Sequence, residues 1–275
     1  MRTAVGATLV LALVAVAASC TPPAPADGKA KADGKAKTDG KAKADPKAKA
    51  DPKAKADAKK ADGKDDEPAP TTAVTPPTPI EAKSWTFDTA QAGKPAPGFK
   101  ASQTGEVVTP AATWEVVADD DAPSGTNVFG VTKSVGTNKT FNVALIEGTS
   151  YRDFEATVML KPLTGENNKG GGIVFRAKGD ADYYVARWNP VENNFRLYAL
   201  LAGARVDITS SPLELDPAAW HSLKVVIAGD KIECFVDDRS IVTAIDKAIP
   251  DAGMIGLFTK GDAATLFDDL VVEQR

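Results

Sequence analysis

Apolar and polar residues alternate along the central part of this 275-residue chain, most clearly from residue 154 to residue 160. The even positions there are Phe, Ala, Val and Leu, while the odd positions include Glu and Thr. This is the two-residue period of a half-buried β-strand. Three further apolar runs, GIVFRA, DYYVARW and NFRLYALL, follow before residue 202, separated by clusters of Gly, Asn and Asp. Residues 151–201 therefore predict four strands joined by turns.

Short segments of the same kind occupy the rest of residues 84–275. They are SWTFD, in which Trp85 and Phe87 are expected to share a face, TWEVVAD, NVFGVTK, TFNVALIEG, ARVDITSS, SIVTAID, GMIGLFTK and LFDDLVVEQR. No segment shows sustained helical periodicity, and Gly or Pro turns recur between them. The pattern predicts an all-β fold, a two-sheet antiparallel jelly-roll sandwich.

One hairpin can be predicted down to its register. In WHSLKVVIAGDKIECFVDD, residues 220–238, the turn is centred on Gly229 and Asp230. A one-residue shift would move the apolar side chains onto the polar face, so the register is well determined. The expected pairs are Leu223 with Val236, Val225 with Cys234 and Ile227 with Ile232.

The same register bears on Cys234 and His221, the one thiol and the one imidazole of the mature domain, which could form a nucleophile and its base. His221 is expected opposite Asp238 and precedes Val225, the partner of Cys234, by four positions. That separation is about 13 Å, beyond hydrogen-bonding distance. We therefore expect Cys234 to be a buried apolar residue and His221 to lie at the rim beside Asp238.

The N-terminus has the features of a secretion signal. Arg2 precedes an apolar run, residues 4–18, that is too short to span a membrane as a helix. Small residues then lead directly to Cys20, which resembles the lipobox of bacterial lipoproteins, whose cysteine becomes the lipidated first residue. Residues 1–20 are expected to be a lipoprotein signal peptide that anchors the protein in the cell envelope, in the outer membrane of a Gram-negative cell. An ordinary cleaved signal is the alternative.

Residues 21–83 predict a disordered spacer. Asp recurs every six residues from Asp27 to Asp57 in a D-G/P-K-A-K-A pattern without large apolar side chains. Residues 27–67 hold 13 Lys against 10 acids, whereas residues 68–275 hold 19 basic against 27 acidic residues. The spacer is either a solvated tether or a lysine-rich contact with an anionic wall polymer. The acidic domain at 84–275 argues against nucleic acid as a partner and leaves the lipid anchor as the expected membrane contact.

A resemblance to the concanavalin A-like lectin/glucanase superfamily rests on five segments in this order: YRDFEATVMLKP, GGGIVFRAKGDADYYVARWNP, WHSLKVVIAGDKIECFVDD, GMIGLFTK and LFDDLVVE. The chain is similar to its laminin-G-like domains and to the 3-keto-disaccharide hydrolase, family-16 glycoside-hydrolase-like domain. The resemblance implies a jelly roll whose concave sheet often holds sugar and whose first and last strands lie side by side. The E-x-D-x-x-E motif of family-16 glucanases is absent, so glucanase activity is not expected.

Polar and aromatic residues of the predicted meander suit a sugar-binding surface, because aromatic rings stack on sugars and Arg donates forked hydrogen bonds. The expected members are Trp188, Arg196, Tyr198, Tyr184 and Arg176. The alternative places Trp188 in the core and pairs the arginines with neighbouring acids. Alternation puts Arg187 on the face opposite Trp188, so the two cannot line one groove unless the strand is bulged.

Asp268 and Asp269, in LFDDLVV, are the candidate metal ligands. Alternation places Asp268 among Leu266, Leu270 and Val272, where a carboxylate needs a partner. Calcium, with backbone oxygens completing its shell, is one interpretation. A β-bulge or a hydrogen-bonded edge aspartate is the favoured alternative. Calcium is the only cofactor that the sequence suggests.

These observations favour a lipid-anchored envelope protein whose jelly-roll domain binds a glycan or cell-wall polysaccharide without catalysing a reaction. A hydrolase or lyase that cleaves 3-keto-disaccharides is the first alternative, and a structural or protein-binding laminin-G-like module is the second. A shared fold does not transfer an activity, so these alternatives stay open, and no catalytic residue is assigned.

Overall fold

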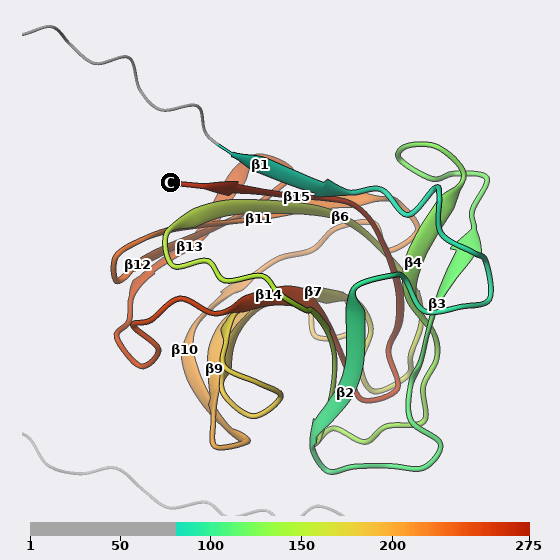
Figure 1. The fold of residues 1–275 in the computed structure, drawn as a ribbon. Coiled ribbons are helices and arrows are strands. Elements are labelled where there is room, and N and C mark those ends of the chain that lie inside the picture. The colour runs from blue at the N-terminus through green and yellow to red at the C-terminus, as the bar shows by residue number, and fades with distance from the viewer. Residues whose placement is uncertain (1–80) are drawn as a thin grey trace, which may run out of the picture. The chain divides into compact units, whose positions relative to one another are not determined.

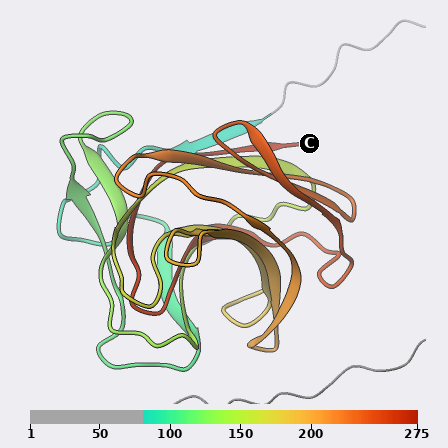
Figure 2. The same ribbon diagram turned by 180° about the vertical axis from the view of Figure 1, so that it is seen from behind.

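The computed structural model describes residues 81–275, whose regular elements are all β-strands. The predicted signal peptide with Cys20, and the predicted spacer up to residue 80, lie outside the described residues. The 15 strands form two antiparallel sheets, here the first sheet and the second sheet, seen from opposite sides in Figure 1 and Figure 2. No helix in this part of the chain is long and apolar enough to cross a membrane. The predicted two-sheet antiparallel jelly roll is confirmed.

The first sheet contains eight strands. Seven follow the spatial order β13 (Arg239–Ile245), β12 (Lys231–Val236), β11 (His221–Ala228), β6 (Phe154–Thr164), β15 (Ala264–Gln274), β4 (Asn127–Lys133) and β3 (Thr113–Ala118). The eighth, β1 (Ala82–Trp85), pairs with β15 from Ala82–Glu273 to Trp85–Leu270. The first and last strands thus lie side by side, as the resemblance implied (Figure 1).

The second sheet contains seven strands. Their spatial order is β10 (Ala204–Pro212), β9 (Asn194–Leu201), β8 (Tyr183–Asn189), β7 (Gly171–Ala177), β14 (Met254–Lys260), β5 (Thr140–Ile146) and β2 (Phe99–Gly105). Figure 1 shows this sheet curling so strongly that β2 stands opposite β9 and β10 across its concave side. The curl is the feature that shapes the candidate site.

The main core lies between the two sheets and takes alternate residues from each strand, as the two-residue period requires. From the first sheet come Phe129, Phe154, Val158, Leu160, Leu223, Val225 and Cys234, and from the second come Tyr184, Ala186, Trp188, Phe195, Leu197 and Leu257. Each large apolar side chain removed from water contributes about 1.5–3 kcal/mol to folding. This layer is the principal source of stability.

A second apolar cluster covers the concave face of the second sheet. It consists of Phe141, Val143, Leu145, Val174, Ala177, Tyr183, Val185, Tyr198, Leu200 and Phe258. These residues occupy the positions between those that face the main core. Where the curl brings β2 towards β8, the Tyr183 hydroxyl donates a hydrogen bond to Thr104 Oγ1 over 3.1 Å. The second sheet therefore buries both of its faces.

Most predicted strands coincide with observed ones. The four strands predicted within 151–201 are β6 to β9. The hairpin register is confirmed, because Leu223 pairs with Val236 and Val225 pairs with Cys234. Cys234 is fully buried, and this burial raises the pKa of its thiol. It occupies the main core as a small apolar residue, as expected.

Two local predictions are wrong, both where the backbone leaves the extended conformation. The strand expected over 84–88 ends at Trp85, because Phe87 has a φ of 65°. His221 contacts Asp237 rather than Asp238, with Nδ1 lying 2.8 Å from Asp237 Oδ2. Asp237 and Asp238 adopt φ values of 47° and 59° in the tight turn before β13, so the ladder ends at Val236.

Candidate functional site

The two faces of the second sheet carry different side chains, and β8 shows the division most simply. Tyr184 and Trp188 belong to the main core. The residues between and before them, Tyr183, Val185 and Arg187, therefore project to the concave face. One face of this strand is aromatic and packed against the first sheet, while the other ends in a buried charge.

Four cationic side chains gather on the concave face, and we call them the basic cluster. They are Arg187 of β8, Arg196 of β9, Arg205 of β10 and Lys260 of β14. Arg187 and Arg196 stand opposite each other in the β8–β9 ladder. The Arg205 guanidinium lies 4.3 Å from the centre of the Tyr198 ring. Burial and the charges of Arg187 and Arg205 lower the pKa of Lys260 to about 8, so the cations influence one another.

Two carboxylates partly balance this charge. Glu192, in the β8–β9 turn, lies 3.2 Å from Nη2 of Arg196 and accepts a hydrogen bond from Asn194 over 3.0 Å. Burial raises the pKa of Glu192, but the Asn194 hydrogen bond and the nearby arginines outweigh it and hold the pKa below its usual value. Asp207 of β10 accepts a hydrogen bond from Nε of Arg205 over 2.8 Å. Four cations thus face two anions, and the excess is positive.

The basic cluster also concentrates polar atoms that have no partner in the protein. Ten buried side-chain nitrogen and oxygen atoms among the described residues lack a hydrogen bond. Six belong to concave-face positions of β8 and β9: Nε and Nη1 of Arg187, Nδ2 of Asn189, Oδ1 of Asn194, Nε of Arg196 and the hydroxyl of Tyr198. Native proteins leave few such atoms, and each calls for an explanation. Their grouping is typical of a site that receives a polar ligand.

The basic cluster has a buried floor and an exposed rim. Arg187 is 1% exposed and Tyr198 is fully buried, and they form the floor. The side chains of Arg196 and Glu192 are each 33% exposed, and that of Arg205 is 21% exposed. The rim is the part of the basic cluster that solvent reaches.

Gly172 of β7 lies beside Arg187 in the second sheet and has no side chain. It is the ladder partner of Arg187 in β8 and of Phe258 in β14. A Cβ at this position would lie 1.8 Å from the carbonyl oxygen of Ala186, so only glycine allows the backbones to approach this closely. On the concave face, Arg187 consequently has a side-chain neighbour on β9 but none on β7.

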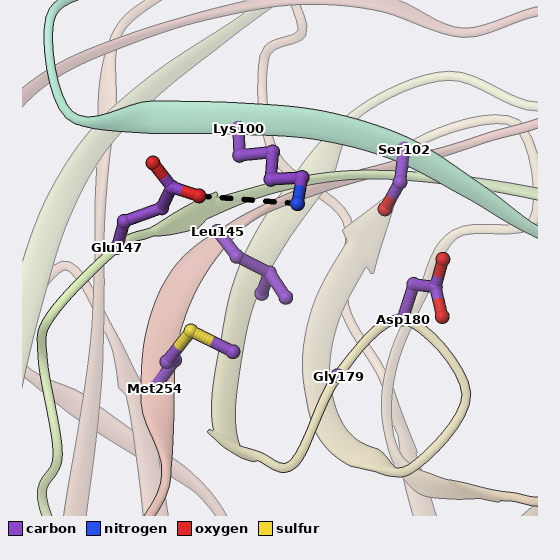
Figure 3. A pocket seen from close by; sticks show the side chains of 7 residues that line it. All are labelled: Lys100, Ser102, Leu145, Glu147, Gly179, Asp180 and Met254. Carbon is purple, nitrogen blue, oxygen red and sulfur yellow. Dashed lines mark ion pairs between the residues drawn. The ribbon is translucent and has the colours of Figure 1, made fainter.

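A cavity of about 230 Å³ opens elsewhere on the concave side (Figure 3). Its lining residues come from β2, β5, β14 and the β7–β8 loop: Lys100, Ser102, Leu145, Glu147, Gly179, Asp180 and Met254. Lys100 Nζ lies 3.9 Å from Glu147 Oε1, and both side chains are more than half exposed. Leu145 and Met254 supply apolar lining. This cavity holds one cation, Lys100, and two carboxylates, Glu147 and Asp180, whereas the basic cluster has an excess of positive charge.

Two of the five residues predicted for the sugar surface lie at the basic cluster, and three do not. Arg196 and Tyr198 project to the concave face of β9. Trp188 lies in the main core, 1% exposed, with its ring packed edge-on against His221 at 5.1 Å between ring centres. The structure thus places Trp188 where the alternative expected it, and the face that contains Arg187 is the one that gathers polar residues.

Tyr184 and Arg176 also lie away from the basic cluster. The Tyr184 hydroxyl donates to Asp246 and accepts the backbone N–H of Ile249 over 2.9 Å. Arg176, at a position of β7 with a φ of 50°, donates to the carbonyl oxygens of Arg152, Gly229 and Ile249. Both side chains hold loops at the edge of the main core and are saturated there.

Sequence reasoning did not single out several residues that lie in or beside the basic cluster. A signal existed for the asparagines, because Asn194, Arg196 and Tyr198 form the polar half of an alternation with Phe195 and Leu197. Arg205 and Lys260 gave no local signal. They reach the site only because β10 pairs with β9, and because β14 inserts beside β7 although it is far away in the sequence.

Asp268 and Asp269, the candidate metal ligands, lie in the first sheet, where backbone and hydroxyl groups donate hydrogen bonds to their carboxylates. Asp268 is fully buried, and its carboxylate oxygens accept the backbone N–H groups of Ser124 over 3.3 Å and of Asp269 over 2.8 Å. Asp269 accepts the Ser124 hydroxyl over 2.6 Å. The register shifts between Asp268 and Val271, and Asp269 has a φ of 47°, which identifies a β-bulge. Among residues 81–275 no three His, Cys, Asp or Glu residues are grouped to hold a metal.

Comparison with known proteins shows a shared fold at low sequence identity. The sequence matches no protein-family model and no curated protein. The carbohydrate binding module CBM66 from Bacillus subtilis is 19% identical, with the alignment covering 64% of this chain and 96% of the module, at a TM-score of 0.51. The cellulose induced protein Cip1 is 15% identical, with coverage of 69% and 96% and a TM-score of 0.50. The domain therefore shares its fold with these two structures.

Proposed function

We propose that the domain binds carbohydrate at the basic cluster and catalyses no reaction there. The proposal is carried by the unpartnered polar atoms, because six of the ten found in the described residues lie on one face of β8 and β9. A buried polar atom without a partner costs about 1–3 kcal/mol. A polar ligand that supplies those partners offsets this cost, and a sugar is such a ligand.

Sugar hydroxyls both donate and accept hydrogen bonds, so they suit the unpartnered atoms of β8 and β9, which are buried and would be reached once the rim side chains move. Arg187, Arg196 and Asn189 supply N–H donors, and Asn194 supplies an acceptor. The Tyr198 hydroxyl can serve in either role. The Tyr198 ring is fully buried and covered by Arg205, so Tyr198 would recognise a sugar through its hydroxyl and not by stacking.

The fold supports a sugar as the first class of ligand to test. The Bacillus subtilis structure that shares this fold is named as a carbohydrate binding module. That name describes the other protein, and a fold hosts many functions. For this chain the proposal depends on the residues of the basic cluster.

Glycan-array screening followed by calorimetric titration tests the proposal. Arg196→Ala should weaken binding about tenfold or more, because a charge-assisted hydrogen bond is lost. The melting temperature should change little, since Arg196 is one-third exposed. Arg239→Ala, at an exposed position of β13 in the first sheet, is the matched control and should bind normally. Failure to bind any glycan would favour the structural or protein-binding alternative.

Product analysis separates binding from turnover. We expect a bound glycan, and a 3-keto-disaccharide offered to the protein, to be recovered intact. Release of reducing sugar from the 3-keto-disaccharide by the wild-type domain, and its loss in Glu192→Gln, would replace the binding role with that of a hydrolase or lyase.

We also propose that Cys20 is lipidated and that the protein is held at the cell envelope. The support is the run of small residues before Cys20 and the Lys/Ala/Asp spacer after it. Cys20→Ser removes the acylated thiol, so the protein should move from the detergent phase to the aqueous phase on partitioning. A Cys20→Ser protein that stays in the detergent phase would contradict the anchor.

A further inference from the structure

We propose that the sugar bound at the basic cluster carries a negatively charged group, either the carboxylate of a uronic acid or a sulfate ester. This inference rests on the proposed function and names the class of sugar that the site selects. The structure points to it through charge, through burial and through the geometry of the unpartnered donors.

The charge balance of the site is the first argument. The basic cluster contributes four cations, while Glu192 and Asp207 contribute two anions. The excess is unusual for this chain, because residues 68–275 hold 27 acidic against 19 basic residues. Elsewhere on the concave side, the cavity in Figure 3 pairs Lys100 with Glu147. A neutral sugar would leave the excess in place, whereas an anionic sugar would reduce it.

Burial makes the excess costly. Arg187 is 1% exposed, and within residues 81–275 it donates a 3.3 Å hydrogen bond from Nη2 to the side-chain oxygen of Asn168 and lies beside the Tyr198 hydroxyl. Its ladder neighbour Arg196 carries a charge of the same sign. A charge taken out of water without a partner destabilises the fold. An anion that reaches this floor is therefore held by attraction that water screens little.

The donor geometry is the third argument. Nε and Nη1 of Arg187 and Nε of Arg196 are free of partners within the protein and lie on the same face. Guanidinium groups present planar forks of N–H donors that match the paired oxygens of carboxylate and sulfate. Four of the six unpartnered atoms are nitrogens that only donate, and one is the hydroxyl of Tyr198. Such a set matches a group that is rich in acceptor oxygens.

Two pairs of probes test the charge of the ligand, each after array screening of the wild-type domain. One pair is trigalacturonate and its methyl ester, and the other is 3′-sulfolactose and lactose. We expect an acidic member to bind at least tenfold more tightly than its neutral partner at low ionic strength, and the difference to shrink as salt is added. The pair that shows the difference tells carboxylate from sulfate.

The variants locate the effect. Arg196→Gln and Arg205→Gln should each reduce the preference for the acidic probe about tenfold, while Arg239→Gln on the first sheet should leave it unchanged. Both cluster residues lie at the rim, so these proteins are expected to fold, and a thermal melt checks it.

The outcomes distinguish this inference from the proposed function. Equal binding of acidic and neutral probes, or an array that shows neutral glycans only, would overturn the inference while sugar binding stands. Inorganic sulfate that binds as tightly as the acidic sugars would show an anion site without sugar recognition, and would overturn both. Absence of any glycan binding would likewise overturn both.

Discussion

Arg176 and Arg187 are two arginines of the same sheet, each 1% exposed, and their surroundings differ in kind. Arg176 donates four hydrogen bonds to backbone carbonyls and lies 3.5 Å from Asp153. Arg187 makes one long hydrogen bond and faces another arginine. Burial of a charged side chain therefore does not by itself reveal its role. The saturated guanidinium of Arg176 holds three loops together, while that of Arg187 is the one that the proposed function assigns to a ligand.

The largest expected effect comes from replacing each of these arginines by Met, which keeps length and removes charge. Arg176→Met should lower the free energy of unfolding by about 3–5 kcal/mol, because carbonyl groups of three loops lose their donor. Arg187→Met should lower the free energy of unfolding by less than about 1 kcal/mol, or should raise it, because a poorly paired buried charge is removed. Urea denaturation of both proteins measures the difference.

Equal losses in the two proteins would mean that Arg187 is a structural residue like Arg176, and the comparison would fail. If Arg176→Met does not fold, Arg176→Lys provides the measurement, since it keeps the charge and loses the fork of donors. Arg187→Met must also lose affinity for the glycan.

The second-largest effect should distinguish Trp188 from Tyr198, two aromatic side chains on opposite faces of the second sheet. Trp188→Ala should cost about 3–5 kcal/mol of folding stability, because it opens a cavity in the main core. Tyr198→Phe removes only a hydroxyl that makes no well-formed hydrogen bond within residues 81–275, so stability should change by less than about 1 kcal/mol. Thermal melting measures both, and titration should show weaker glycan binding for Tyr198→Phe alone. A stable Trp188→Ala protein with reduced affinity would assign recognition to the core face.

A smaller effect concerns Glu192, the acid that now pairs with Arg196. Glu192→Gln removes a negative charge from the rim and leaves an amide of the same shape. We expect affinity for the acidic probe to rise by about threefold to tenfold, and affinity for the neutral probe to stay the same, because a carboxylate no longer competes for Arg196. Equal changes for both probes, in either direction, would point to a hydrogen bond between Glu192 and a sugar hydroxyl.

The smallest effect is on pH dependence, through Lys260. Its pKa falls to about 8 in the folded domain, from an ordinary value of about 10.4 in the unfolded chain. Between these values the unfolded chain binds more protons, so this residue makes stability rise with pH across that window. Affinity for an acidic probe should fall as pH rises through about 8, because Lys260 loses its charge. Lys260→Met should remove both trends relative to the wild type, and trends that persist in it would assign them to other groups.

The strands were predictable because alternation survives wherever one face of a sheet is apolar. The hairpin of β11 and β12 could be placed to the residue for that reason. The errors at Phe87 and Asp237 occur at positive φ, which a residue other than glycine adopts only in special turns. Phe87 gives no local sign of such a conformation, whereas aspartate, present at both 237 and 238, adopts it more readily than most residues.

The candidate site was less predictable, for a physical reason. All seven residues of β8 are buried, because the main core covers one face and the curl of the sheet covers the other. The alternation of side chains along β8 then does not indicate which face packs against the first sheet and which is the concave face. The sequence could separate Arg187 from Trp188, but only the curl shows that the arginine side is the concave side.

The pairing of β1 with β15 has a consequence for how neighbouring molecules behave. The edge of β15 is covered by β4 along Thr265–Phe267 and by β1 along Leu270–Glu273. A fragment that begins after Trp85 would leave the second half of this edge with open backbone donors and acceptors. Open edges recruit strands from other copies, which leads to aggregation. The four residues of β1 therefore cover this part of the β15 edge and hinder its pairing with strands of other copies.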